Sequence, residues 1–229
     1  MPLHVSPATE TDAPRIAAIH MAAFGTNPML LAQFPTAPIR SNLQLSIAAK
    51  TLADIRDAKI AVLVVRDDGY DSVDNGDDGV ISFAKWSLPV REGERYVEAP
   101  WVWPEGTDLE LLDRWSGVVE GAKGRVVGEW GCYRLTFIGT DPLHERRGAA
   151  SLLVQWGLQH CVQDIIPAYL ESTVDAGPLY ERHGFTAAEK ISMVVKGRDG
   201  EDVVYEEVCF IFRPSARSSM MSSQTQSTI

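Results

Sequence analysis

Hydrophobic residues recur at three- and four-residue spacing near the amino terminus, which is the period of a helix with one buried face. Thr11 and Asp12 precede this stretch as capping residues, and Pro14 falls in the first turn, where its missing N–H does no harm. Gly25 ends the pattern. The spacing therefore predicts an amphipathic helix with an apolar face formed by Ile16, Ile19, Ala23 and Phe24.

The same spacing predicts further helices along the chain. A second helix begins with Ser41 as its cap, and its apolar stripe consists of Leu45, Ala48, Leu52 and Ile55. A long helix is expected over residues 147–161, with one face formed by Ala149, Leu152, Leu153, Trp156 and His160. An amphipathic piece covers residues 109–119, and a short helix over residues 177–183 is stopped by Gly184.

Runs of β-branched and aromatic residues predict strands between these helices. The expected strands cover residues 3–5, 60–65, 80–86, 132–140, 167–172, 185–195 and 203–212. The aspartate- and glycine-rich residues 67–79 read as a hairpin loop, because their spacing does not fit an EF-hand calcium loop. The alternation of helices and strands predicts a single α/β domain over residues 1–213.

Three segments lack a regular pattern. Residues 26–40 contain three prolines among apolar side chains, so we expect an irregular segment that packs against the domain, beside a ligand. Residues 87–128 form an irregular insertion, and connections of that length are usually functional. Residues 214–229 are polar and low in complexity, so we expect a disordered tail.

Composition narrows the class of protein. The chain has 229 residues, of which 45% are hydrophobic and 23% charged, which suffices for a core and excludes disorder over the whole length. Its net charge of −10, without a Lys/Arg-rich stripe, argues against nucleic-acid and membrane partners. No apolar run approaches the about 20 residues of a spanning helix, and no signal-peptide pattern is present.

The cysteines indicate the compartment. Cys132, Cys161 and Cys209 are scattered and odd in number, so a disulfide framework is not expected and a reducing compartment is. Their spacing, and that of the histidines, does not fit a metal site. We therefore expect a cytoplasmic protein without a metal.

The segment between the strand at 132–140 and the following helix carries candidate chemistry. Gly148, Ala149 and Ala150 leave the amide groups of a helix start unobstructed, and such a start is an anion site. Arg146 and Arg147 stand at the same end, where cations are disfavoured unless an anion shares the site. The open amide groups and the two arginines together favour a binding site for a polyanion such as pyrophosphate. The alternative is a solvated helix start at which the arginines occur by chance.

Two motifs together resemble those of the GNAT superfamily of acetyl-CoA-dependent N-acetyltransferases. The segment Glu145-Arg-Arg-Gly-Ala-Ala150 matches the pyrophosphate motif of the superfamily, with Glu145 where Arg or Gln is usual. The segment from Leu179-Tyr180 to Gly184-Phe185 matches its later motif. The match covers residues 132–190, and the chain looks most like fungal-type members with a long insertion before the central strand.

The resemblance implies a mixed, mostly antiparallel sheet flanked by helices, with two central parallel strands that splay apart. Acetyl-CoA would lie in this gap, with pantetheine along the strand edge at Phe137, Ile138 and Gly139. The amides of residues 147–150, together with Arg146 and Arg147, would hold the pyrophosphate. No metal takes part.

The resemblance also implies catalytic roles. Tyr180 would protonate the leaving thiolate, and Glu171 is the first candidate to take the proton of the substrate ammonium, before Glu129. His144 and His183 are expected to be exposed loop or helix-end residues. Cys132 and Cys161 are expected in the core, so transfer would be direct, without an acetyl-cysteine.

These observations predict acetyl transfer to the primary amine of a small molecule, in a monomer or a homodimer. The acidic surface, together with residues 26–40, Trp101 and Trp103, favours an amine that carries an apolar body. Two alternatives remain open. Glu145 favours a catalytically degenerate module that binds CoA or a partner protein, and a protein-lysine acetyltransferase would need a groove for an extended peptide.

Overall fold

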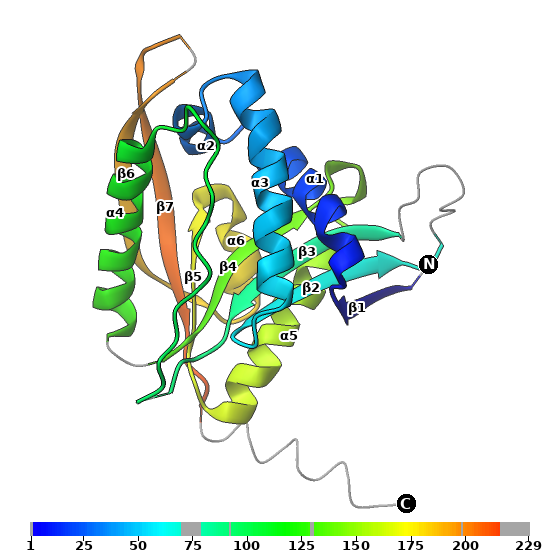
Figure 1. The fold of residues 1–229 in the computed structure, drawn as a ribbon. Coiled ribbons are helices and arrows are strands. Elements are labelled where there is room, and N and C mark those ends of the chain that lie inside the picture. The colour runs from blue at the N-terminus through cyan, green and yellow to red at the C-terminus, as the bar shows by residue number, and fades with distance from the viewer. Residues whose placement is uncertain (1, 70–78, 92, 129–130, 198, 216–229) are drawn as a thin grey trace, which may run out of the picture.

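One seven-stranded sheet, in the order β1-β2-β3-β4-β5-β7-β6, forms the centre of the molecule (Figure 1). The computed structural model describes residues 2–69, 79–91, 93–128, 131–197 and 199–215. The strands are β1 Leu3–Pro7, β2 Ile60–Asp67, β3 Val80–Ser87, β4 Tyr133–Thr140, β5 Ala168–Thr173, β6 Thr186–Lys196 and β7 Asp202–Phe212. Neighbouring strands are antiparallel except β4 and β5. The predicted mixed, mostly antiparallel sheet is therefore confirmed.

Helices cover both faces of this sheet. They are α1 Ala13–Phe24, α2 Pro28–Gln33, α3 Ala37–Ile55, α4 Leu109–Val127, α5 Ala149–Asp164 and α6 Gly177–Arg182, with single 3-10 turns at Glu10–Asp12, Pro142–His144 and Val174–Ala176. On one face, Trp86 and Leu170 pack with Leu153 of α5 and Tyr180 of α6. On the other face, Phe83 packs with α1, and α3 and α4 lie further along the sheet (Figure 1).

The prediction of irregular structure for residues 26–40 was wrong, because this segment contains α2 and the start of α3. The side chain of Asn27 accepts hydrogen bonds from the amides of Met29 and Leu30 and so caps α2. Thr36 caps α3 in the same way, which places the start of that helix before Ser41. The prolines at positions 28 and 38 occupy first turns, where no N–H is needed, so they begin helices rather than break them.

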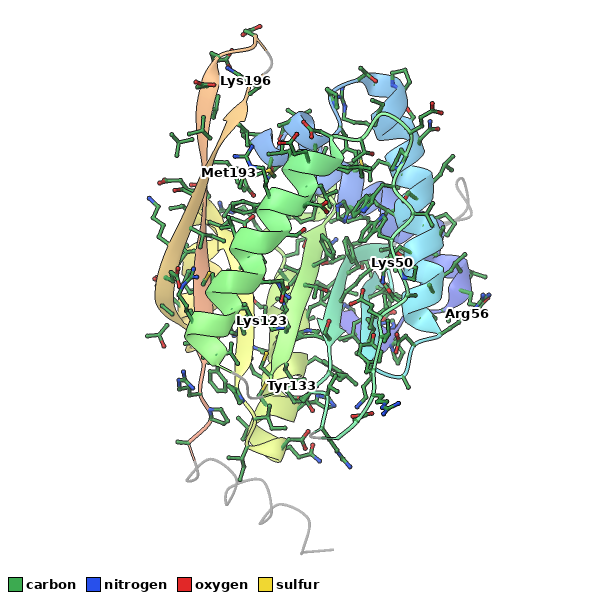
Figure 2. All side chains as sticks on the ribbon, turned by 60° about the vertical axis from the view of Figure 1, so that its left-hand side comes forward. Lys50, Arg56, Lys123, Tyr133, Met193 and Lys196 are labelled. Carbon is green, nitrogen blue, oxygen red and sulfur yellow. The ribbon has the colours of Figure 1, made fainter. Side chains whose placement is uncertain are left out.

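The buried face of α3 also differs from the predicted stripe. Leu45 is 70% exposed, whereas Lys50 and Asp54 are 6% and 3% exposed. Figure 2 shows α3 at Lys50 lying across from α4 at Lys123, with side chains filling the space between them. The prediction used the spacing of apolar residues only. It could therefore not identify a buried helix face that consists partly of an ion pair.

The connection between β3 and β4 contains more helix than expected. The described residues of 88–108, which leave out residue 92, form no helix or strand, but α4 extends to Val127 instead of stopping near residue 119. The side chain of Asp108 caps this helix by accepting a hydrogen bond from the amide of Leu111 at 2.9 Å. Helix α4 lies over β5, β7 and β6, so the connection reaches across the sheet.

The remaining predictions on elements agree with the structure within a few residues. Strands β2 and β3 are antiparallel neighbours, as a hairpin at 67–79 requires, although residues 70–78 lie outside the described part. The same holds for residues 216–229 of the expected tail. Among the described residues, no helix combines the length and apolar character that crossing a bilayer requires.

The parallel pair β4–β5 splays apart, as expected. Its register covers three pairs, from Tyr133↔Ala168 to Leu135↔Leu170. On its other side β4 stays paired with β3 as far as Thr140, with a bulge at Thr136 where the register shifts. The carboxyl-terminal half of β4 therefore has one paired edge and one edge that faces a gap.

Candidate active site

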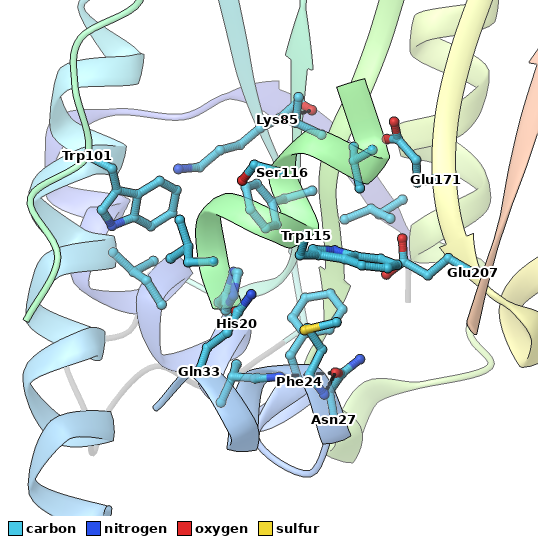
Figure 3. A pocket seen from close by; sticks show the side chains of 18 of the residues that line it. His20, Phe24, Asn27, Gln33, Lys85, Trp101, Trp115, Ser116, Glu171 and Glu207 are labelled. Carbon is cyan, nitrogen blue, oxygen red and sulfur yellow. Dashed lines mark hydrogen bonds between the residues drawn. The ribbon is translucent and has the colours of Figure 1, made fainter. Parts of the chain in front are cut away.

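A cavity of about 590 Å³ lies between the sheet and helices α1 to α4 (Figure 3). Its sheet wall includes Phe137 and Ile138 of β4, where we expected pantetheine to pair. Gly139 follows on the same strand, and a Cβ there would come within 2.9 Å of the Phe83 ring. The expected strand edge thus lines a real hollow, and its glycine is required by packing.

Tyr180 reaches this cavity from the opposite face of the sheet, through the gap between β4 and β5. It lies in α6, is 4% exposed, and packs against Phe185 and Phe210 at ring distances of 6.0 and 5.7 Å. Burial raises the pKa of Tyr180 to about 12, against a smaller lowering by the Ser172 side chain. A phenol with this pKa keeps its proton at neutral pH and can donate it to a thiolate.

Glu171 of β5 also lines the cavity, next to Arg134 of β4. Arg134 donates from Nη2 to Oε1 of Glu171 at 2.9 Å, and from Nη1 to Glu120 of α4 at 2.5 Å. Burial raises the pKa of Glu171, while the charge of Arg134 acts in the opposite direction. The Glu171 carboxylate therefore lines the cavity as expected, but the Arg134 guanidinium that pairs with it also pairs with Glu120.

A third carboxylate, Glu207 of β7, was missed by the sequence analysis. Thr173 of β5 lies opposite it, and the Tyr205 hydroxyl donates a hydrogen bond to its Oε1 at 2.5 Å. Asn27 in turn donates to the Tyr205 hydroxyl oxygen at 3.1 Å. Burial raises the pKa of Glu207, and the charge of Glu171 adds to the rise. Strand alternation puts residues 205, 207 and 209 on one face, and that signal could have found it.

Three carboxylates, Glu120, Glu171 and Glu207, line this end of the cavity against two cations. Arg134 pairs with Glu120 and Glu171, and Lys123 lies 3.5 Å from Glu120, so the three carboxylates exceed their cations by one charge when ionised. Figure 3 shows Glu171 and Glu207 on the same side, near the indole of Trp115. A bound ammonium would reduce the remaining negative charge, so this end fits a cation.

His20 is a further cavity residue that the sequence analysis did not consider. Its ring lies between Phe24 and Phe137, with centroid distances of 4.8 and 5.1 Å. Burial, helped by the charge of Lys85, lowers the pKa of His20 to about 3. It is therefore uncharged at neutral pH and a poor proton acceptor.

Aromatic side chains form the wall on the helix side. Trp101 and Trp103 stack at 4.5 Å and nearly parallel, and Trp101 lies 6.0 Å from the Phe137 ring. The Trp101 indole N–H donates to Ser46 of α3 at 2.9 Å, which fixes the segment 88–108 over the cavity. The Phe34 ring lies tilted against Trp103 at a centroid distance of 5.9 Å, so residues 26–40 do pack at the site.

The start of α5 follows the open end of β4. Gly148, with φ +90°, is its N-cap residue, and no described side chain caps it. A Cβ on Gly148 would meet nothing within 4 Å, so the space before the amides of Ala149 and Ala150 is open. Arg146 also has a positive φ, +60°. An uncapped helix start with open space in front fits an anion.

Arg147 stands at the same turn, but its guanidinium has other partners. It donates to Asp67 of β2 at 2.7 Å and lies 3.2 Å from Nδ1 of His144. Glu145 is exposed beside it. The structure thus brings the residues that were expected to hold the pyrophosphate together at one turn. Of the two arginines, Arg147 already pairs with Asp67.

The other predicted residues are placed as follows. Cys132 and Cys161 are buried, and burial raises the pKa of Cys161 to about 12, so the thiols stay protonated. His144 and His183 are half-buried at a loop and a helix end. Glu129 lies outside the described residues. Within the described parts, no three of the usual metal-binding side chains come together.

Comparison with known proteins finds similarity in structure alone. No protein-family model matches the chain, and no curated protein sequence does. The structure of a histone acetyltransferase HPA2 and related acetyltransferase of Corynebacterium glutamicum aligns with a TM-score of 0.62 at 19% identity, over 94% of this chain and 98% of that one. The polyamine N-acetyltransferase of Drosophila melanogaster aligns with 0.59 at 14%, over 93% and 100%.

A third solved structure includes a substrate. Arabidopsis thaliana NAA60 in complex with acetyl-CoA aligns with a TM-score of 0.53 at 15% identity, over 93% of this chain and 98% of that one. At such identities the likeness concerns the fold. The chain has a GNAT-like fold, and its structural neighbours are acetyltransferases.

Proposed function

We propose that this protein transfers an acetyl group from acetyl-CoA directly to the primary amine of a small molecule. One observation carries the proposal: the unpaired edge of β4, the Tyr180 phenol and the carboxylates of Glu171 and Glu207 border the same cavity. The fold of known acetyltransferases supports it. The long connection 88–132 supports, within the proposal, a fungal-type member of the superfamily.

The chain offers matching groups for the pantetheine and the pyrophosphate of acetyl-CoA. On the edge away from β3, the alternate backbone groups of residues 137–139 would bind pantetheine as a neighbouring strand does, whereas the Gly139 carbonyl accepts a hydrogen bond from Ser82 of β3. The amides of Gly148, Ala149 and Ala150 would bind the pyrophosphate, with Arg146 and Arg147 as counter-charges. Arg147 would have to leave Asp67 for this contact. Acetyl-CoA supplies a thioester, whose carbonyl carbon is the electrophile.

The transfer needs two proton movements, and the cavity has a group for each. Glu171 takes a proton from the substrate ammonium, directly or through water, and the freed amine attacks the thioester carbon. A backbone amide in the bulged part of β4 polarises the thioester carbonyl. As the C–S bond breaks, Tyr180 gives its proton to the thiolate, and the second proton lost by the attacking nitrogen restores the phenol, so that the amide and the CoA thiol are released. Holding both substrates in one cavity supplies much of the rate.

The charges favour an amine over other acceptors. With two cations, Arg134 and Lys123, against the three carboxylates of this end, the remaining negative charge attracts an ammonium and positions it near the gap. The aromatic wall around Trp101 supports an acceptor with an apolar body. Among the structural neighbours, the Drosophila enzyme is a polyamine N-acetyltransferase, which agrees with an amine.

Two observations favour a second candidate, a module that binds CoA without transfer. Glu145 is exposed where the superfamily motif has Arg or Gln, and the guanidinium of Arg147 is bound by Asp67. Both reduce the positive charge available to the pyrophosphate. The intact site around Tyr180 argues for catalysis, so the two candidates differ in whether thiol is released.

Thermal unfolding with and without acetyl-CoA is the first experiment. A ligand at a hundred times its Kd adds about 2.7 kcal/mol to the free energy of unfolding. For a domain of this size that raises Tm by several degrees. An upward shift would be followed by an amine screen that detects free thiol, comparing small amines with a lysine peptide. No shift at millimolar acetyl-CoA would overturn the proposal, and a shift without thiol release would favour the binding module.

A further inference from the structure

Two buried lysines line the cavity at the end away from Glu171 and Glu207. Lys50 comes from α3 and Lys85 from β3, and their side chains are 4% and 3% exposed. Figure 3 shows Lys85 extending toward Trp101, away from both glutamates. Burying an ammonium is costly unless it has partners, and acetyl transfer to an amine gives these two lysines no task.

Asp54 of α3 connects the two lysines. Lys85 donates to its Oδ2 at 2.8 Å, and Lys50 donates to its Oδ1. All three residues stand on regular elements and are almost fully buried. With both lysines protonated, the rigid part of this cluster carries one net positive charge, opposite in sign to the glutamate end of the cavity.

A carboxylate from the irregular segment supplies the fourth charge. Glu98 lies 2.6 Å from the Lys50 ammonium, and its side chain is 50% exposed. It belongs to residues 93–108, which form no helix or strand. The anion that neutralises the cluster therefore reaches in from the solvent side, and a carboxylate of a bound molecule can occupy an equivalent position.

Lys85 has hydrogen-bonding capacity left for such a molecule. In the described parts of the chain, Asp54 is its hydrogen-bond acceptor, which leaves two of the three N–H groups of an ammonium. The ammonium also lies 5.9 Å from the Trp101 ring centroid. Burial lowers the pKa of Lys85, so an anion bound here would stabilise its charged form.

The two charged ends of the cavity are separated by one strand. Lys85 on β3 pairs with Phe137 of β4, and Glu171 lies on β5, beyond β4. Two strand spacings amount to about 10 Å, and the backbones of Lys85 and Glu171 lie at least that far apart because β4 and β5 splay beyond Leu170. Phe137 of β4 lies between these two strands, and the Trp101 ring lies 6.0 Å from the Phe137 ring, so a molecule that reaches both ends is elongated and apolar in the middle.

We propose that Lys85, with Lys50, binds an anionic oxygen of the acceptor, so that the preferred acceptor is an elongated amine with a carboxylate or similar anion at its far end. The site defines the substrate class of the proposed acetyl transfer. For the amine end, the inference rests on the proposed function, whereas the anion end can be tested without any transfer.

Calorimetric titration with para-ethylbenzoate tests the anion end alone, because this probe has no amine. We expect one binding event per chain, weakened at least about tenfold by Lys85→Met. Lys190→Met is the matched control, since Lys190 is exposed on β6 and paired with Glu206, outside the cavity. Binding that is absent, or equal in both variants, would overturn the site.

Glu98→Gln gives an independent reading that does not depend on a buried substitution. The change removes the charge that competes for Lys50, so we expect para-ethylbenzoate to bind more tightly. If the cluster only fastened the segment 88–108 to α3, the same variant would lower Tm and leave binding of the probe unimproved. That result would contradict the proposal even if Lys85→Met failed to fold.

Kinetics separate this inference from the proposed function. With saturating acetyl-CoA, we expect kcat/KM for para-carboxyphenethylamine to exceed that for phenethylamine at least about tenfold, and Lys85→Met to abolish the difference. Equal values in the native protein would refute the anion site while leaving acetyl transfer intact. If the probe bound in a Lys85-dependent way but neither amine were acetylated, the anion site would be supported and the proposed acetyl transfer contradicted.

Discussion

Gly157 of α5 lies directly against Trp86 of β3: a Cβ on the glycine would stand 2.2 Å from the indole ring. The indole N–H donates to the carbonyl of Leu153 one turn earlier, at 3.3 Å. Trp86 is fully buried in the core that α5 shares with the sheet. Gly157 therefore allows α5 to approach β3 closely.

Replacing this glycine should cost stability. We expect Gly157→Ala to lower the free energy of unfolding by about 1–3 kcal/mol, because the indole or the helix must shift to make room. Urea unfolding measures it. Gly124→Ala in α4 is the control, since a Cβ there meets nothing within 4 Å and alanine favours helix by about 0.5–1 kcal/mol. Equal effects of the two changes would contradict the close contact.

Tyr180→Phe should reduce turnover and leave acetyl-CoA binding almost unchanged. Loss of a general acid costs about 10²–10⁴ in kcat, whereas the ring that packs against Phe185 and Phe210 remains. Thiol release and the thermal shift with acetyl-CoA measure the two effects. Tyr133→Phe, which removes a hydroxyl bonded to Asp164 outside the cavity, should keep full activity. Unchanged turnover in Tyr180→Phe would exclude its role as acid.

The same residue sets the alkaline limb of the pH profile. The acid must be protonated, so activity falls as pH rises through the pKa of Tyr180, which burial raises to about 12. We therefore expect no loss of kcat up to pH about 10 from this group. A fall in kcat near neutral pH would assign the proton donor to another residue.

The acidic limb should report the carboxylate that takes the ammonium proton. Burial raises the pKa of both Glu171 and Glu207, and the base must be ionised, so kcat/KM rises with pH through a value above the usual range of a glutamate. We expect Glu171→Gln to lower kcat/KM about a hundredfold or more and to remove this limb.

Two comparisons sharpen that measurement. Glu189→Gln is the control, because this glutamate pairs with Arg125 on the outer strand β6. Glu207→Gln keeps a hydrogen-bond acceptor for Tyr205 and removes the second charge. If Glu207→Gln abolished the limb and Glu171→Gln did not, the proton acceptor would be Glu207, to which the uncharged Tyr205 hydroxyl donates, rather than Glu171, which Arg134 holds.

Gly148→Ala separates backbone strain from substrate binding. At φ +90° an alanine is strained by about 1–2 kcal/mol, and the added methyl group would stand in front of the amides of α5. Gly200→Ala, at φ +81° and equally open, should lower Tm to a similar extent. Only Gly148→Ala should weaken acetyl-CoA binding, measured by calorimetry. Equal affinities in both variants would remove the start of α5 from the site.

The sequence predicted the motif residues of the site better than the other side chains that line the cavity. Tyr180 and Glu171 could be assigned because a short motif and a strand place them, and both do line the cavity. Glu207 comes from a strand with no motif, and its position depends on how β7 pairs with β5. Lys50 and Asp54 lie on a helix face where periodicity counts apolar residues only.

The helices of residues 26–40 were missed for a local reason. Pro28 and Pro38 read as breakers when counted by composition, but both stand just after a capping side chain, Asn27 or Thr36. A proline is compatible with the first turn, because the N–H groups of that turn have no partner within the helix. Examining the residue before each proline would have predicted two helix starts.

The short β4–β5 ladder makes the molecule two half-sheets, β1 to β4 and β5 to β7, joined by a seam of three register pairs. A molecule bound in the gap adds its own hydrogen bonds to β4 and its own contacts to α6, and so lengthens that seam. Acetyl-CoA bound there would pair with β4 as an additional strand does. Amide hydrogen exchange should slow on both sides of the gap together when acetyl-CoA binds, since neither half can open alone once the seam is filled.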